Sequence, residues 1–571
     1  MNRKIYIITG ILFYVLLQSC SSDYEDVPVE QFTEDFVFSR TDSIGEKAQQ
    51  FLTSIYASAL SNGHNRLNGD YLDAATDDAI SSALSITDVE NLATGNYTSM
   101  ERIDSDMKWG DYYAVFRKVN TFVNNIDKVP LKMKFNDGQP MTRAWKAEAR
   151  FLRAYTYFNL LKRYGGVPIV PEYNLGLEDA IEFPRSSFEE GVNYIVTELD
   201  AIKDSLRIRP IENSADAHVA TKGTALALKS RVLLYAASPL FNGGNIDATN
   251  PLTGYTDYEA SRWKKAADAA QEFMNQLPYY QLNSSYITIF TDANPEIIFF
   301  RDQGRGKSIE TTNGPIGYGS PNDGDGRTSP SQNLVEAFPM ADGKTINDPT
   351  SAYTYNPNNQ YIHRDPRLDF TVLHNNSLWL NKDVETFEGG KDNPTSGIQK
   401  TKTSYYMRKF MGAFENSDNY DDHRRDWIIF RYAEILLNYA EAENEYSGPT
   451  TEVYQAIKNL RERAGIEAGT DGMYGLKPNM TKDEMRTTVH NERRIEMAFE
   501  EQRYWDIRRW KIAEDVYSKP VNGLTIVRTG GTFSYNLVPV LNPSFEEKQY
   551  LYPIPYSEVV KNDNMQQNPG W

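Results

Sequence analysis

The fold of this 571-residue chain is decided by residues 143–164, which read RAWKAEARFLRAYTYFNLLKRY. Small and apolar residues recur there every three or four positions, whereas four basic residues of the first half lie largely off that face. Gly165 and Gly166 then end the helical pattern, and Pro168 prevents the helix from restarting. The stretch therefore predicts an amphipathic helix with one face packed on a core.

The same periodicity predicts a mostly α protein. Further helices are expected at about 45–59, 109–128, 186–206, 218–237, 258–277, 426–446, 451–464 and 481–514. Several combine alanines with aromatic residues, as at Trp263 and Ala266, which lets paired helices approach closely. The arrangement is similar to tetratricopeptide hairpins, but the full repeat consensus is missing. An ordinary all-helical core explains the same alanines equally well.

The middle of the chain has a different composition. Gly, Pro, Asn and Asp supply 39 of the residues from 301 to 400, a density that breaks helices. A long irregular segment within a compact protein is usually functional. Aromatic residues stand among these turn formers, and we expect a binding surface here.

The bulk composition argues for a binding protein rather than a catalyst. The net charge of −18 disfavours nucleic acid, whose phosphates require a basic surface. A single cysteine and six scattered histidines provide no pattern for a metal site or a disulfide framework, so we expect no metal and no cofactor. No nucleophile elbow, phosphate-binding loop or nucleotide fingerprint occurs.

Two acidic segments allow other interpretations. The stretch 490–510 is rich in Glu and Arg at spacings of three and four, which favours a salt-bridged helix face over an acid–base site. The run from Asp323 to Gly326 could supply oxygen ligands for calcium, but a tight turn is the preferred interpretation.

The N-terminus predicts export. Arg3 and Lys4 precede an apolar stretch at 5–17 that is too short to span a membrane, and Leu17-Gln18-Ser19-Cys20 closes it. This pattern resembles a bacterial lipobox. We expect a signal peptide at 1–19, lipid attachment at Cys20 and a flexible acidic tether at 20–40. A plain signal peptide that ends near a cysteine is the alternative.

Six sequence blocks occur in order along the chain. They read AEARFLRAY at 147–155 with YGGVP at 164–168, KSRVLLYAASP at 229–239, RYAEILLNYAEA at 431–442, ERRIE at 492–496 with RYWDIRRW at 503–510, LYPIP at 551–555 and NMQQNPGW at 564–571. Together they resemble the SusD/RagB family of surface nutrient-binding lipoproteins of Bacteroidetes. Asp23, Glu25 and Asp26 also resemble the acidic export tag of such lipoproteins.

The resemblance implies a SusD-like α/α fold in one domain, 41–571. A tetratricopeptide-like scaffold of helical pairs would occupy roughly 41–300 and 426–571, and a loop-rich lobe would be inserted at roughly 301–425. It also implies oligosaccharide binding without catalysis, and delivery to a SusC-like TonB-dependent transporter. The protein would be lipid-anchored in the outer membrane and exposed at the cell surface.

The blocks belong to the scaffold, so candidate ligand residues rest on the expected position of the lobe and on local composition. One group comprises Arg66, Asp70, Asn96 and Tyr97, and the other comprises Tyr318, Arg327, Tyr353, Tyr355 and Trp379. Each has a structural alternative: Trp379 as a buried anchor, the arginines as solvated loop charges, and Asp70 and Asn96 as turn residues. Five helical tryptophans are expected in the core instead: Trp109, Trp145, Trp263, Trp505 and Trp510.

Three other functions remain open. The chain could be the peptide-binding kind of importer subunit found in the same family. It could be a surface hydrolase, which requires two carboxylates across a cleft. It could also be a lid without affinity of its own, with all specificity in the transporter.

Overall fold

The structure is a computed structural model that describes residues 33–571 except positions 65, 135–137, 177, 180–181, 209–216 and 416. The expected signal peptide, the lipid-attachment residue Cys20 and most of the tether lie outside the described residues. Among the described helices, none combines the length and hydrophobicity of a bilayer-spanning segment.

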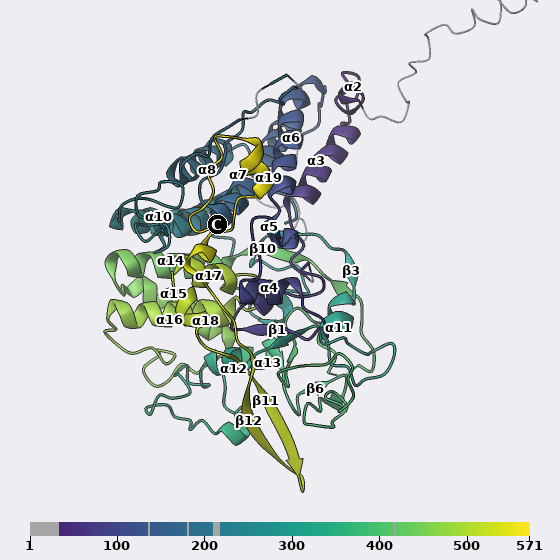
Figure 1. Cartoon of the computed structure of the whole chain (residues 1–571), viewed down its shortest axis with the longest axis vertical. Helices are drawn as coiled ribbons and strands as arrows, with labels where there is room; N and C mark the ends of the chain where they lie inside the picture. The colour runs from purple at the N-terminus through teal and green to yellow at the C-terminus, as the bar shows by residue number, and fades with distance from the viewer. Residues whose placement is uncertain are drawn as a thin grey trace, which may run out of the picture.

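Most helices of the N-terminal half stack at one end of the molecule, whereas α4 lies near the middle, beside strand β1 (Ala79–Ser81) (Figure 1). Helix α3 packs on α6 and α7, α7 packs on α8, and α9 contacts both α8 and α10. The helices are α2 (Glu34–Val37), α3 (Glu46–Ala59), α4 (Asp88–Thr94), α5 (Asp104–Met107), α6 (Trp109–Asn125), α7 (Met141–Tyr164), α8 (Phe188–Ile202), α9 (Lys222–Ala237) and α10 (Ala260–Gln276).

The C-terminal helices continue this stack, because α10 packs on α14 and α14 packs on α15 and α16. They are α14 (Tyr432–Ser447), α15 (Thr451–Ala464), α16 (Lys482–Glu496), α17 (Arg503–Arg509), α18 (Ala513–Tyr517) and α19 (Tyr556–Lys561). Side-chain caps define several helix starts: Ser187 and Glu190 form a capping box at α8, as Thr481 and Glu484 do at α16. The expected mostly α fold is confirmed.

Two expected helices have different boundaries. The segment 426–446 opens with strand β10 (Trp427–Arg431), which pairs with β2 (Ile297–Arg301) before α14 begins. The segment 481–514 is broken between α16 and α17, where Phe499 and Glu501 adopt positive φ angles of 62° and 58°. The prediction of one continuous helix there is wrong, because the backbone N–H of Phe499 donates to the buried Asp73 carboxylate (2.8 Å) and the chain turns to reach it.

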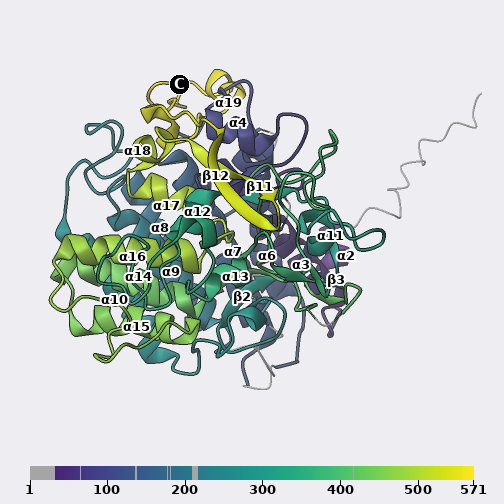
Figure 2. The ribbon, with the colours of Figure 1, turned by 90° about the horizontal axis from the view of Figure 1, so that it is seen from below.

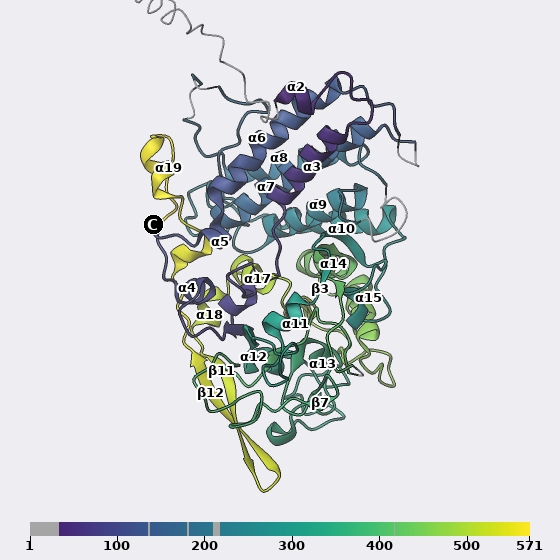
Figure 3. The same cartoon turned by 90° about the vertical axis from the view of Figure 1, so that its right-hand side faces the viewer.

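The loop-rich segment forms a lobe of short elements at the other end (Figure 1). Its helices are α11 (Ser308–Asn313), α12 (Gln332–Ala337) and α13 (Arg367–Thr371). Its strand pairs are β1 (Ala79–Ser81) with β4 (Thr328–Pro330), β3 (Arg305–Gly306) with β9 (His423–Arg424), β5 (Val372–Leu373) with β8 (Tyr406–Met407), and β6 (Leu378–Trp379) with β7 (Lys382–Asp383). Strands β11 (Val521–Thr529) and β12 (Thr532–Leu541) form a hairpin that projects at the end opposite α2 (Figure 3).

The acid–base cluster of 490–510 has a structural role, as expected, but it lies in the core rather than on an exposed helix face. Arg431 is fully buried and pairs with Glu296 and Glu496 at 2.7 Å and with Glu500 at 2.7 Å. Burial raises the pKa of Glu496, but the guanidinium groups of Arg463 and Arg431 hold it well below its ordinary value. The network joins the helical scaffold to the segment that precedes the lobe. The five helical tryptophans are buried, which confirms their assignment to the core.

Candidate functional site

The pairing of β1 with β4 brings Asp70 and Arg327 together at the lobe. Ser81 faces Thr328 in this ladder, and both hydroxyls donate to the Asp70 carboxylate, at 2.7 and 3.2 Å. Arg327 donates its Nε to the same carboxylate at 3.1 Å. Its terminal Nη1 and Nη2 have no hydrogen-bond partner within the described residues. Asp70 therefore fixes the position of the Arg327 guanidinium through its Nε, and the two terminal nitrogens remain available as donors to a ligand.

Burial dominates the electrostatics of Asp70. The side chain is fully buried, and this raises the pKa of Asp70 to about 6, although the neighbouring charge of Arg327 lowers it. The net charge of the Asp70–Arg327 pair should therefore change in mildly acidic solution, where the Asp70 carboxylate becomes protonated.

A polar rim borders Arg327. Asn68 and Gly69 turn the chain with positive φ angles of 56° and 102°, and a Cβ at Gly69 would lie 3.3 Å from the Arg327 side chain. The Asn68 amide donates to Asp88 (3.0 Å), which also accepts from the Ser105 hydroxyl (2.6 Å). The close approach of the turn to Arg327 fixes the position of this rim.

Exposed apolar side chains flank the same site. The backbone N–H of Ser82 donates to the Arg327 carbonyl (2.8 Å), and the loop that follows presents Leu84 and Ile86, which are 73% and 70% exposed. We use the name lobe surface for Asn68, Leu84, Ile86, Asp88 and Arg327. The lobe surface combines the terminal nitrogens of Arg327, unpaired within the described residues, with the exposed apolar side chains of Leu84 and Ile86.

Arg66 lies close in sequence to this surface but is buried. Its guanidinium pairs with Asp106 and Glu501, both at 2.6 Å, and its side chain is 7% exposed. The alternative of a solvated loop charge is therefore wrong for Arg66, because two carboxylates from distant segments surround it. Arg327, at 19% exposure, is also ion-paired rather than freely solvated.

Tyr318 lies on the loop that leads to Arg327. Its hydroxyl donates to the Lys382 carbonyl (3.2 Å), and the Lys391 ammonium lies 4.2 Å from the ring centroid. The half-buried ring therefore already has a cation near it. Asp323 accepts from the backbone N–H groups of Tyr318 and Gly319, which fits the tight-turn interpretation. Within the part of the chain that the structure describes, no group of three metal-ligating side chains occurs.

Trp379 is a buried anchor in this structure. The indole is fully buried and packs against Phe414, Tyr420 and Arg408, with the two ring centroids at 5.5 and 6.0 Å. No face of the ring is available for stacking on a ligand.

The remaining candidates lie in two other places. Tyr353 stacks on His363 and donates to Glu467, and the Tyr355 hydroxyl donates to Gln360, so both belong to a separate loop region. Tyr97 is buried and stacks on the C-terminal Trp571, while the exposed Asn96 bonds to Asn91 at the end of α4.

The nine candidates therefore form no single cluster, and their contact with a ligand stays a prediction. The sequence analysis missed Asn68, Asp88, Lys391, Leu84 and Ile86. For Asn68, the turn dipeptide Asn68-Gly69 was an available signal.

Comparisons with known proteins agree with this architecture. A model described as the SusD family matches residues 295–571, and a second, described as starch-binding and associating with the outer membrane, matches residues 24–234. SusD-like protein P2 of Formosa agariphila is 25% identical, with complete coverage of both chains.

Solved structures share the fold. A SusD-like protein from Bacteroides fragilis superposes with a TM-score of 0.74 at 26% identity, over 95% of this chain and 100% of the other. A laminarin-binding SusD-like protein gives a TM-score of 0.63 at 18% identity, over 92% and 99% of the two chains. From its ordered sequence blocks, its helical architecture and these matches, the chain belongs to the SusD/RagB family.

Proposed function

We propose that this protein binds oligosaccharide or polysaccharide at the lobe surface, without catalysis, and delivers it to a SusC-like TonB-dependent transporter. The observation that carries the proposal is Arg327, which is fixed by a buried carboxylate and keeps both terminal nitrogens unpaired. Family membership sets the context, since one matching model is described as starch-binding.

The chemistry of the lobe surface suits a sugar chain. A saccharide offers pairs of hydroxyl oxygens, which a planar guanidinium can engage with two parallel donors. Its C–H faces need apolar contact, which Leu84 and Ile86 supply beside Arg327. Several such contacts along a polymer would add up.

The nearby carboxylates favour binding over hydrolysis. Asp70 accepts three hydrogen bonds and is fully buried, and Asp88 accepts two. Both are therefore occupied as positioning groups, whereas a glycosidase needs one carboxylic acid and one carboxylate that both reach the scissile bond.

Anchoring and export complete the proposal. The protein would be held in the outer membrane by a lipid on Cys20, with residues 20–40 as a tether to a single domain at 41–571. In Figure 1 the described chain begins at the α2 end, opposite the lobe and the β11–β12 hairpin. A tether at α2 would therefore leave the lobe free to meet polysaccharide.

The test is affinity electrophoresis and calorimetry of residues 21–571 on starch, laminarin and other neutral and charged polysaccharides. We expect Arg327→Lys, which keeps a charge beside Asp70 but loses the fork, to weaken binding by about tenfold. The matched control is Arg143→Lys, because Arg143 is an exposed residue near the start of α7 and lies outside the lobe surface, so this substitution should leave binding unchanged.

Each contrary outcome identifies another function. Peptide binding without polysaccharide binding would indicate the peptide importer. Release of reducing sugar would indicate a hydrolase. Co-purification with the transporter, without measurable ligand binding, would indicate a lid. Binding that Arg327→Lys leaves unchanged would refute the lobe surface and keep the function.

A further inference from the structure

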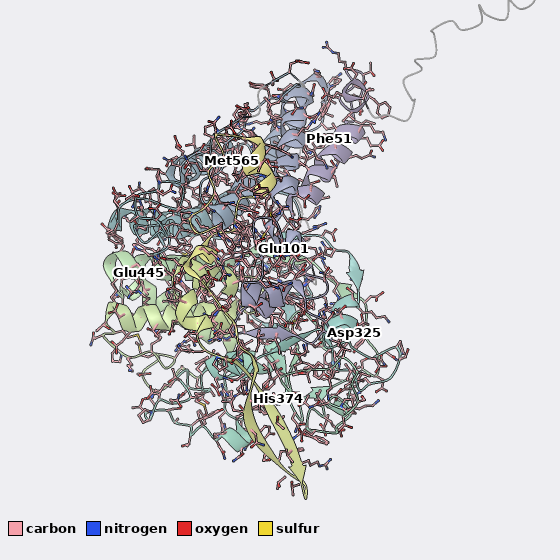
Figure 4. The ribbon with its side chains drawn as sticks, viewed as in Figure 1. Phe51, Glu101, Asp325, His374, Glu445 and Met565 are labelled. Atoms are coloured by element: carbon pink, nitrogen blue, oxygen red, sulfur yellow. The ribbon has the colours of Figure 1, made fainter. Side chains whose placement is uncertain are left out.

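A cavity of about 420 Å³ opens on the helical scaffold, between the end of α9 and helices α10, α14 and α16. We name it the scaffold pocket and define it by Tyr258, Trp263, Glu441, Glu445, His490 and Trp510. Glu445 and Asp325 lie on opposite sides of the molecule in Figure 4. Figure 2 agrees, with α14 and α11 at opposite edges. Arg327 follows Asp325 by two residues, so the scaffold pocket lies on another side of the molecule from the loop that carries Arg327.

Aromatic rings form its walls. His490 stacks on Trp510 with ring centroids 3.6 Å apart and planes at 13°. Trp263 contributes from α10 and is almost fully buried, whereas Tyr258 is 61% exposed. Flat apolar surfaces in a cavity of this size suit a ring-shaped ligand.

The charges of the scaffold pocket neutralise one another. Glu445 accepts two hydrogen bonds from Arg486, at 2.6 and 2.5 Å. Glu441 accepts from the Arg509 guanidinium and, at 2.8 Å, from the Trp510 indole. The Lys482 ammonium, which also lines the scaffold pocket, lies 3.6 Å from the Glu445 carboxylate, and Arg486 also pairs with Asp483. Each charged side chain of the scaffold pocket therefore already has a partner of opposite charge.

The groups without hydrogen bonds are neutral. Across the described residues, the Tyr258 hydroxyl, the Trp263 indole N–H and the His490 ring nitrogens have no hydrogen-bond partner. Burial lowers the pKa of His490 to about 4, so the ring is neutral at pH 7 and offers one donor and one acceptor. A ligand for the scaffold pocket therefore needs apolar faces and neutral donors and acceptors at its edge.

We propose that the scaffold pocket is a second saccharide site, which binds one or two rings of a neutral glycan between Tyr258, Trp263 and His490. This inference rests on the proposed function, because it assigns the same ligand class to a second face. Two separate sites on one protein would bind a long polysaccharide more tightly than either site alone.

The experiment follows the tryptophans of the scaffold pocket directly. Protein labelled with 5-fluorotryptophan is titrated with maltotriose and laminaritriose, and with a trimer of galacturonic acid as the charged comparison. The ¹⁹F signals of Trp263 and Trp510 are assigned from the Trp→Phe proteins. We expect saturable shifts with a neutral trimer and none with the acidic one.

Variants test the site without disturbing the core. Tyr258→Ala should raise the half-saturating concentration by about tenfold, the loss expected for one aromatic stacking contact. Tyr446→Ala is the matched control, because Tyr446 is 45% exposed on α14 and does not line the scaffold pocket. Arg327→Lys should leave the shifts unchanged.

The results separate the two proposals. Retention on polysaccharide without any shift at Trp263 or Trp510 would overturn the second site and keep the proposed function. Shifts that persist when Arg327→Lys abolishes retention support an independent second site. Absence of both retention and shifts would overturn both proposals, and a Tyr258→Ala titration equal to wild type would overturn this placement.

Discussion

Replacing Asp70 by Asn tests whether burial or the Arg327 charge dominates the electrostatics at the lobe surface. Burial raises the pKa of Asp70 from 3.8 to about 6 against the opposing charge of Arg327. A difference of this size corresponds to about 3 kcal/mol between the two protonation states. The amide oxygen of Asn can still accept from Ser81 and Arg327, so the geometry is preserved.

The sign of the pH dependence follows from linkage. A group whose pKa is higher in the folded state contributes stability at acidic pH, and this contribution is lost as the pH rises through the folded pKa. The unfolding free energy of the wild type minus that of Asp70→Asn should therefore fall by about 3 kcal/mol between about pH 4 and pH 6.5, and then stay level.

Urea denaturation followed by circular dichroism across this range measures that difference. The control is Asp515→Asn, because the Asp515 carboxylate is 71% exposed and its only ion pair among the described residues is with the exposed Lys519. Exposed pairs of this kind contribute less than about 1 kcal/mol, so this substitution should have a small effect on the unfolding free energy. If the unfolding free energy of the wild type minus that of Asp70→Asn rises with pH instead of falling, the reasoning is refuted. Such a rise would mean that the Arg327 charge outweighs burial and that Asp70 is held ionised.

Three further substitutions test the core. Arg431→Met removes the cation that Glu296, Glu496 and Glu500 share, while Arg463 and Lys409 still pair with them. It should cost about 3 kcal/mol at neutral pH, the lower end of the range for a broken buried pair, and less in acid as the carboxylates become protonated; urea titrations at two pH values measure this. Trp379→Ala should cost about 3–5 kcal/mol in urea denaturation, and a folded variant that loses only ligand binding would contradict the buried position. Gly63→Ala places a Cβ 2.0 Å from the Trp427 ring and should lower the melting temperature by overpacking. An unchanged melting temperature would contradict that contact.

The sequence predicted the scaffold better than the site because helical periodicity is local, whereas exposure depends on distant segments. The apolar face of 143–164 needs only its own spacing to be recognised, and α7 covers that stretch. The break before α17 has no local signal, since Phe499 and Glu501 are not residues that favour positive φ, and a contact with Asp73 produces it. Strand β10 did carry a signal in the β-branched pair Ile428 and Ile429, which helical spacing concealed.

Aromatic residues in loops were predicted less well for the same reason. A tryptophan between two leucines at 378–380 fits a stacking platform and a buried anchor equally, and only its packing against Phe414 and Tyr420 decides between them. Arg327 shows the opposite case. A lone loop arginine gains a defined direction from Asp70, which lies 257 positions away in the sequence. Such long-range pairs cannot be read from local composition.

The blocks that identify the family are also the blocks that hold the scaffold together. Several of their charged residues are buried and pair: Arg231 with Glu434 and Arg509 with Glu441 between two blocks, and Arg493 with Asp506 between the two halves of one block. A buried ion pair loses several kcal/mol when one partner is removed, so substitutions there are constrained in pairs. Leu84 and Ile86 carry no such constraint, because they are exposed and have no partner to lose, whereas Arg327 is constrained only through its pair with Asp70. The lobe surface can therefore change its ligand while the scaffold blocks stay recognisable, which explains why these blocks identify the family but not the glycan.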